Sequence, residues 1–158
     1  MYRIGDKVVH PMHGAGIIED IVEQQAGDNV FDYYVVKLTT NSMLVMVPVH
    51  TCEHIGVRPV IDCVEADRVI NAIGTMESCE DTNWNKRYRD NMSHIKSGDL
   101  MQVAQVVKSL VLRDREKGLS TGERKMLSSA KQILISEIGL VKETSYEEIE
   151  GIINVAIS

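Results

Sequence analysis

The sequence predicts a multidomain α+β protein, in which a small N-terminal β-barrel over residues 1–60 precedes an all-α domain over residues 61–158. Two observations predict this order. Short β-branched and aromatic runs, separated by tight turns, fill the first sixty positions, a pattern typical of strands. After residue 61 the apolar residues recur every three or four positions, which is the period of a helix. Of the 158 residues 44% are hydrophobic, which is enough for a core.

The N-terminal module contains segments with the composition of strands, namely residues 7–10, 17–22, 33–38 and 43–48. Gly14 allows a tight turn or a bulge after the first segment, and Gly27 lies in a turn between the second and third. We expect a single helical turn over residues 51–56 and an extended segment over 57–60. Four or five short strands with tight connections favour a barrel, because closure limits exposed strand edges.

Five helices are expected after residue 61, and polar residues mark where four of them begin. The expected N-terminal caps are Thr82, Asp99, Ser120 and Ser145. Ser120 and Ser145 are each followed three positions later by a glutamate, which is the spacing of a capping box. Gly98 can take the left-handed conformation that ends a helix. The positions expected to face the core are Val64, Val69, Ile70, Ile73, Leu100, Val103, Ala104, Val107, Leu110, Val111, Leu127, Ala130, Leu134, Ile138, Ile149, Ile152, Ile153 and Ala156.

The charge is distributed unevenly along the chain. The net charge is −6, but residues 1–81 carry −8, residues 82–135 carry +6 and residues 136–158 carry −4. A basic block between acidic ends predicts a localised contact with a polyanion, and it leaves a separate acidic surface for a protein partner.

The cellular compartment is predicted from the start of the chain and from its cysteines. The N-terminus has no apolar signal region and no apolar run approaches the ~20 residues of a membrane span, so we expect a cytoplasmic protein without membrane contact. Cys52, Cys63 and Cys79 are odd in number and lack C-x-x-C spacing, which favours reduced thiols over a disulfide framework.

Residues 82–89 are the strongest candidate for a functional site, because they hold the only tryptophan, Trp84, next to a run of cations. If Thr82 caps a helix there, its free N–H groups and positive dipole end suit a phosphate. Cations that bind the backbone and a ring that lies against bases fit nucleic acid. The alternative is that Trp84 fills the seam between the two domains and the cations are a solvated helix face. The cations are Lys86, Arg87 and Arg89, joined by Arg124 and Lys125 on the surface of a later helix.

A second hypothesis, from a different class, is a metal-dependent hydrolase. His50, Cys52 and His54 can in principle approach one ion, although they lack the spacing of a known zinc module and a fourth ligand. No nucleophile–base pair, paired-carboxylate motif or phosphate-binding glycine loop is evident. We therefore expect no enzyme, no cofactor and no small-molecule substrate.

Four blocks of the sequence resemble motifs of one family, the CarD/CdnL family of bacterial RNA polymerase-binding transcription regulators. The first resembles G-D-x-V-V-Y-P-x-H-G-x-G over residues 5–16, with His10 where Tyr is usual. The second resembles N-W-x-x-R-Y over residues 83–88. The S-G-D block at residues 97–99 and the G-L-S-x-G-E-x-x-M-L block at residues 118–127 complete the match, which runs from residue 5 to about residue 139.

The resemblance implies a Tudor-like β domain that docks on the β subunit of RNA polymerase and a helical domain that touches promoter DNA. It implies that Trp84 wedges into the minor groove at the upstream edge of the melted promoter and so stabilises the open complex. Asn83 belongs to the same block, and Lys86, Arg87, Arg89 and Lys125 match basic residues near the DNA backbone. No spacing predicts base-specific readout, so promoter-general binding is expected. The protein would then associate with the nucleoid through the polymerase.

Polymerase contacts are expected on the strands of the β domain. The candidate residues are Gln24, Tyr34, Val45, Met46 and Val47. Gln24 and Met46 stand where some relatives carry Arg. An exposed edge strand can pair with a strand of a partner, so that the backbone supplies affinity and alternate side chains supply selectivity.

Overall fold

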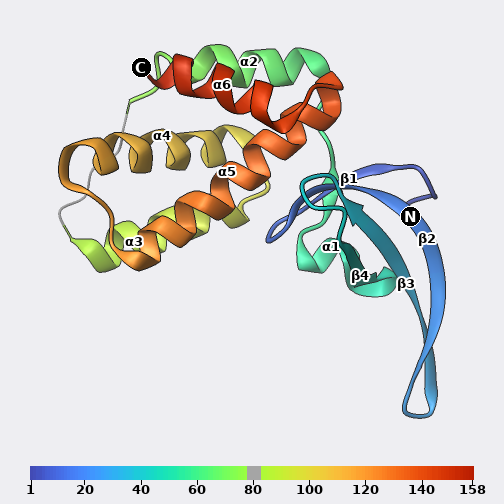
Figure 1. Cartoon of the computed structure of the whole chain (residues 1–158). Coiled ribbons are helices and arrows are strands. Elements are labelled where there is room, and N and C mark those ends of the chain that lie inside the picture. The colour runs from blue at the N-terminus through green and yellow to red at the C-terminus, as the bar shows by residue number, and fades with distance from the viewer. Residues whose placement is uncertain (78–82) are drawn as a thin grey trace.

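The computed structural model describes residues 1–77 and 83–158, an N-terminal antiparallel sheet followed by helices (Figure 1). The strands pair in the order β4-β3-β2-β1-β5. Their bounds are β1 Lys7–His10, β2 Gly14–Ala26, β3 Asn29–Leu38, β4 Leu44–Pro48 and β5 Arg58–Pro59. A 3-10 turn, η1 (Val49–Thr51), and a short helix, α1 (Cys52–Ile55), lie between β4 and β5, which confirms the helical turn expected there.

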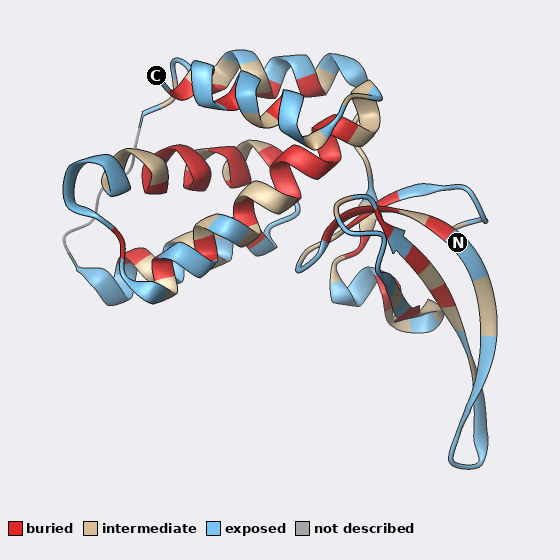
Figure 2. Cartoon of the chain, viewed as in Figure 1, coloured by how far each residue is buried: buried red, intermediate tan, exposed pale blue. Residues whose placement is uncertain are grey.

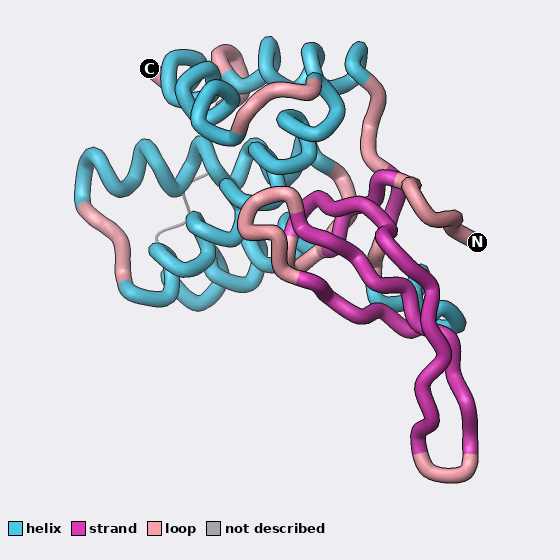
Figure 3. Tube along the Cα trace, turned by 45° about the vertical axis from the view of Figure 1, so that its right-hand side comes forward, coloured by secondary structure: helices cyan, strands magenta, loops and turns pink. Residues whose placement is uncertain are grey.

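The prediction of a closed barrel is not confirmed, because the sheet is open. Neighbouring strands pair from β4 to β5, and no pairing within the described residues joins these two outer strands. A second difference is the length of the β2–β3 hairpin. The ladder continues outward to Gln25↔Val30 and Ala26↔Asn29, so that a two-stranded arm extends away from the body (Figure 3). The turn at Gly27, which has φ +64°, lies where the sequence predicts it.

The helices begin and end close to the predicted residues. Their bounds are α2 Cys63–Ile73, α3 Trp84–Lys96, α4 Leu100–Lys117, α5 Thr121–Lys142 and α6 Tyr146–Ile157. The side chains of Asp99, Ser120 and Ser145 each accept a backbone N–H, which confirms these three caps. Thr82 lies outside the described residues, as does Cys79, and Asn83 caps α3. Within the described residues, no helix is both long and apolar enough to cross a membrane.

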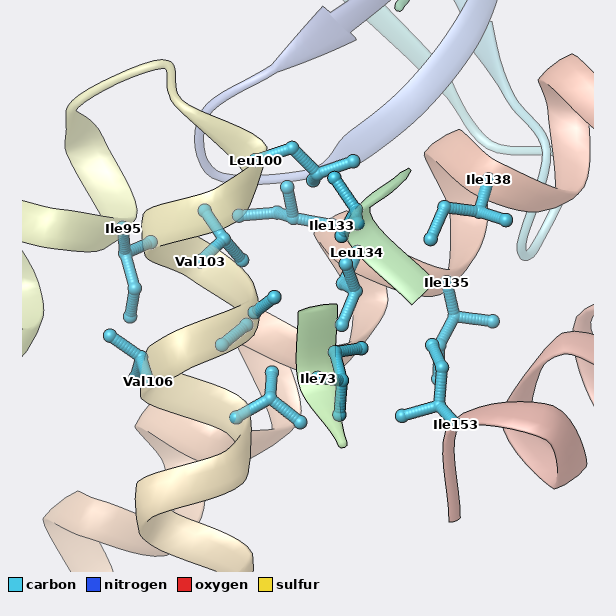
Figure 4. Close-up of a cluster of buried hydrophobic side chains, with 14 of the residues drawn as sticks. Ile73, Ile95, Leu100, Val103, Val106, Ile133, Leu134, Ile135, Ile138 and Ile153 are labelled. Atoms are coloured by element: carbon cyan, nitrogen blue, oxygen red, sulfur yellow. The ribbon is translucent and has the colours of Figure 1, made fainter. Parts of the chain in front are cut away.

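The main core is formed by α2, α4, α5 and α6 (Figure 4). It includes Val103, Leu134, Ile138 and Ile153, each at most 1% exposed. Most positions expected to face the core are buried or half-buried, but Val64 is 77% exposed and Ile152 is 43% exposed. Both lie on the solvent side of helices whose other apolar residues suffice for packing, so these two predictions are wrong.

The sheet packs directly on α5, and the two modules share part of one core (Figure 2). The fully buried carboxylate of Glu137 accepts two hydrogen bonds from the Arg58 guanidinium, at 2.7 and 2.8 Å, and a third from the backbone N–H of Ile61. The hydroxyl of the preceding residue, Ser136, accepts the backbone N–H of Ala15 at 2.9 Å. Buried charge-assisted bonds of this kind hold the β module in a defined orientation on the helices.

Candidate nucleic-acid interface

Trp84 occupies the first position of α3, where it is both supported and accessible. Its ring stacks on Tyr88 one turn later, with centroids 5.2 Å apart and planes inclined by 22°. The indole N–H donates to the Ser120 hydroxyl at 3.3 Å, and the residue remains 44% exposed. The indole is therefore held in one orientation while part of it faces solvent.

Gly122 in the first turn of α5 lies against the aromatic pair. A Cβ at Gly122 would lie 3.5 Å from Cε2 of Tyr88 and 3.9 Å from Cζ2 of Trp84, which is ordinary contact distance. The glycine of the G-L-S-x-G-E block is thus the surface on which the aromatic pair rests.

Arg87 differs from the other predicted cations, because it is buried. It is 6% exposed, and its guanidinium donates to the Glu123 carboxylate, from Nε at 3.0 Å and from Nη2 at 3.4 Å. Arg113 from α4 approaches the same carboxylate at 3.9 Å. The prediction of Arg87 as a surface contact for a phosphate is therefore corrected: the side chain fixes α3 against α5, and so fixes the helix turn that carries Trp84.

The pKa of Glu123 reflects this environment. Burial opposes ionisation of the carboxyl, but the hydrogen bonds and charge of Arg87, together with hydrogen bonds from Ser120, outweigh it and lower the pKa below its usual value. Glu123 is ionised at neutral pH, and its Oε1 also accepts the Ser120 hydroxyl at 3.2 Å. One buried carboxylate thus binds both Arg87 and the hydroxyl that receives the Trp84 N–H.

The remaining predicted cations are exposed on the same pair of helices. Lys86 and Arg89 lie on α3 within the first two turns after Trp84, and Arg124 and Lys125 lie in the first turns of α5, next to Ser120 and Gly122. Asn83 is exposed as well, and its side chain accepts the backbone N–H of Lys86 at 3.3 Å. The N-terminal ends of α3 and α5 therefore carry four exposed cations and one partly exposed indole.

The placement of Trp84 contradicts the alternative that it fills the seam between the domains. The seam is built around Ser136 and Glu137, near the C-terminal end of α5. Trp84 contacts Ser120 at the opposite end of that helix, 16 residues before Ser136, which corresponds to roughly 24 Å. Its described contacts are all within the helical domain.

The predicted polymerase-binding residues divide into exposed and buried sets. Gln24 and Met46 are exposed, the latter by 40%, and Val45 is half-buried. Tyr34 and Val47 are 2% exposed and face each other across β3 and β4, so their prediction as side-chain contacts is wrong. The alternation of a strand explains this, because every second residue of β4 points into the core.

Two further apolar residues beside these, Met43 and Leu44, were not predicted as contacts and are 60% and 58% exposed. Leu44 is the first residue of β4, an outer strand of the sheet, and Met43 precedes it. Exposed apolar side chains next to an unpaired strand edge are the signal that could have identified them.

The hypothesis of a metal site finds no support in the geometry. His50 is exposed and stacks on Phe31 with centroids 5.2 Å apart, Cys52 is buried, and His54 is exposed. Burial, reinforced by the charge of Glu53, raises the pKa of the Cys52 thiol, which disfavours the thiolate that a metal would need. Across residues 1–77 and 83–158, no three His, Cys, Asp or Glu side chains form a group that could hold an ion.

Comparison with known proteins agrees with the resemblance. A family model described as "CarD, C-terminal domain" matches residues 68–154, and one described as "CarD-like/TRCF RID domain" matches residues 2–61. A curated relative from Bacillus subtilis (strain 168), named "Putative transcription factor YdeB", is 36% identical over 151 residues. That match covers 96% of this chain and 99% of the relative.

Proposed function

This chain belongs to the CarD/CdnL family of transcription regulators, and from that premise we propose that it stabilises the open promoter complex of RNA polymerase. In this proposal the β module binds the polymerase β subunit, and Trp84 wedges into the minor groove at the upstream edge of the melted DNA. The observation that carries the proposal is the partly exposed indole, held against Tyr88 and Ser120 on helix ends that also carry four exposed cations.

A wedge of this kind acts by selective binding. Inserting an apolar side chain between base pairs costs a few kcal/mol of unstacking, which is smallest where the duplex is already opening. Trp84 therefore binds the opened state more strongly than the closed duplex and shifts the equilibrium between them without catalysing a step. Stacking worth ~1–3 kcal/mol changes that equilibrium by roughly five- to a hundred-fold.

The cations supply affinity that does not depend on sequence. Lys86, Arg89, Arg124 and Lys125 are exposed on the same helix ends as Trp84, where phosphates can reach them. The N-terminal dipoles of α3 and α5 add to this positive potential. Contacts of this type release counterions, so the affinity for promoter DNA should fall steeply with salt.

Within the β module, the outer strand β4 has the edge that we expect to pair with a strand of the polymerase. Its free edge and the exposed side chains of Leu44 and Met46 offer backbone pairing together with apolar contact. The family model that matches residues 2–61 is described as a "CarD-like/TRCF RID domain", and this match supports an interaction with RNA polymerase. We place the protein in the cytoplasm, associated with the nucleoid through RNA polymerase.

The test is the lifetime of the open complex with wild-type chain and with Trp84→Ala. The variant should bind RNA polymerase as the wild type does, because Trp84 is remote from the sheet, while the lifetime falls by about five- to a hundred-fold toward that of polymerase alone. Lys117→Ala, at the exposed C-terminal end of α4, is the control for loss of a surface side chain. Equal lifetimes for wild type and Trp84→Ala would refute the wedge.

A further inference from the structure

A small apolar groove lies next to the aromatic pair, on the side of Tyr88 away from the first turn of α3. Its volume is 160 Å³, and it is bordered by α3, α5 and the loop that joins β1 to β2. The apolar residues that form most of its wall are Met12, Tyr88, Met92 and Met126. Methionine side chains adapt to flat ligands and make favourable contacts with aromatic rings.

The charges around the groove are of one sign. Lys96 and Lys125 line it, both are exposed, and no acidic residue is among the described residues that border it. An apolar surface between two ammonium groups complements a group that is flat and apolar but attached to anions. A nucleotide has this combination, because its base has two π faces and its backbone carries a phosphate on each side.

The groove is continuous with the Trp84 surface. Trp84, Tyr88, Met92 and Lys96 are spaced four residues apart, so they form one row along α3. The distance along the helix from Trp84 to Met92 is about 12 Å, or about three to four times the 3.4 Å spacing of stacked bases. A strand released from pairing at the wedge therefore reaches the groove within a few nucleotides.

We propose that this groove binds one unpaired base of the melted DNA strand, with Lys96 and Lys125 on the flanking phosphates. This inference rests on the proposed function, because it places the groove on the strand that Trp84 holds open. A partner helix is a poorer occupant, because its apolar face needs a groove for several anchor residues, whereas this groove has a volume of 160 Å³ and is bordered by two cations. A single flat group fits it better.

The experiment fills the groove without touching the wedge. Ser129 is half-buried and borders the groove, whereas Ser128, the preceding residue on α5, is exposed and does not line it. Ser129→Leu and Ser128→Leu are therefore matched variants, each to be checked for native helicity and unfolding midpoint. Their affinities, and that of Trp84→Ala, are measured by fluorescence anisotropy at low salt for a forked duplex with one single-stranded arm and for the fully paired duplex.

We expect Ser129→Leu to weaken binding to the fork by about five- to a hundred-fold, the range for loss of one stacked base, and to leave the paired duplex unaffected. Ser128→Leu should match the wild type on both DNAs. If Ser129→Leu binds the fork as tightly as the wild type while Trp84→Ala binds it more weakly, base binding in the groove is refuted and the proposed function stands. A loss in Ser129→Leu alone would support the groove and count against the wedge. No wild-type binding to either DNA would overturn both.

Discussion

Glu123 binds Ser120, the hydrogen-bond partner of Trp84, and its replacement by Gln gives a quantitative prediction. Its carboxylate is 3% exposed, binds Arg87 through two hydrogen bonds and accepts the hydroxyl of Ser120. In Glu123→Gln the charge disappears while the size is kept. Arg87 then stays buried and loses its charge-assisted bonds to Glu123.

The expected cost follows from this burial. Removing one member of a buried ion pair costs about 3–5 kcal/mol. Since Gln retains one acceptor oxygen, we expect the free energy of unfolding to fall by about 3 kcal/mol. For a chain of this length each kcal/mol lowers the melting temperature by about 2–4 °C, so Tm should fall by about 6–12 °C. An exposed ion pair would contribute only about 0–1 kcal/mol, so the measurement separates the two cases.

Urea unfolding followed by the fluorescence of Trp84 is the suitable assay, because the chain has a single tryptophan. The native emission should also shift to longer wavelength in Glu123→Gln, since Ser120 and the first turn of α3 lose a shared partner. Glu116→Gln on the exposed side of α4 is the control and should stay within about 0.5 kcal/mol of the wild type. A free energy of unfolding for Glu123→Gln within that same margin would refute the claim that this carboxylate holds Trp84 in place.

Two further predictions concern the β module. Gly14 has φ +85° and a Cβ there would lie 2.7 Å from the Ser136 hydroxyl, so Gly14→Ala should lower the stability by about 1–3 kcal/mol in urea unfolding. Gly27→Ala is its control, with φ +64° and no atom within 4 Å, and an equal loss in both variants would show that the close approach contributes nothing. Burial first, and then the nearby charge of His13, lower the pKa of His10 to about 4. The folded pKa lies below the unfolded value of roughly 6.5, so the unfolded state takes up a proton at His10 more readily than the folded state. The wild type therefore has its full stability above a pH of roughly 6.5 and loses stability as the pH falls toward 4. His10→Tyr, measured by urea unfolding across this range, should show a smaller loss, and parallel curves would contradict the shifted pKa.

Local chemistry explains why the helical domain was predicted well. The caps at Asp99, Ser120 and Ser145 depend on a side chain that bonds to a backbone N–H two or three positions later, and such contacts are visible in the sequence. The buried stripe of α4 follows from helical periodicity in the same way. The length of the hairpin arm was underestimated, because residues 23–32 are mostly polar and lack the composition typical of strands.

Long-range pairing explains why part of the site was not predicted. Arg87 belongs to a row of cations, and nothing near it indicates that Glu123, 36 positions later, removes it from the surface. Tyr34 and Val47 were predicted as contacts because aromatic and β-branched residues suit both a core and an interface. The open edge of the sheet likewise depends on how β1 and β5 pair, across almost fifty residues.

The joint between the modules gives the wedge its effect under the proposed function. If β4 is bound to the polymerase, the orientation of α3 depends on Glu137, Ser136 and the shared core. A flexible linker would let the helical domain sample many positions, and each productive contact would cost the entropy of ordering it. Because the joint already orders the two modules in the folded protein, DNA binding does not have to supply this entropy cost. The stacking energy of Trp84 is then available to favour open over closed DNA, so loosening Glu137 should weaken the effect even though that residue touches neither partner.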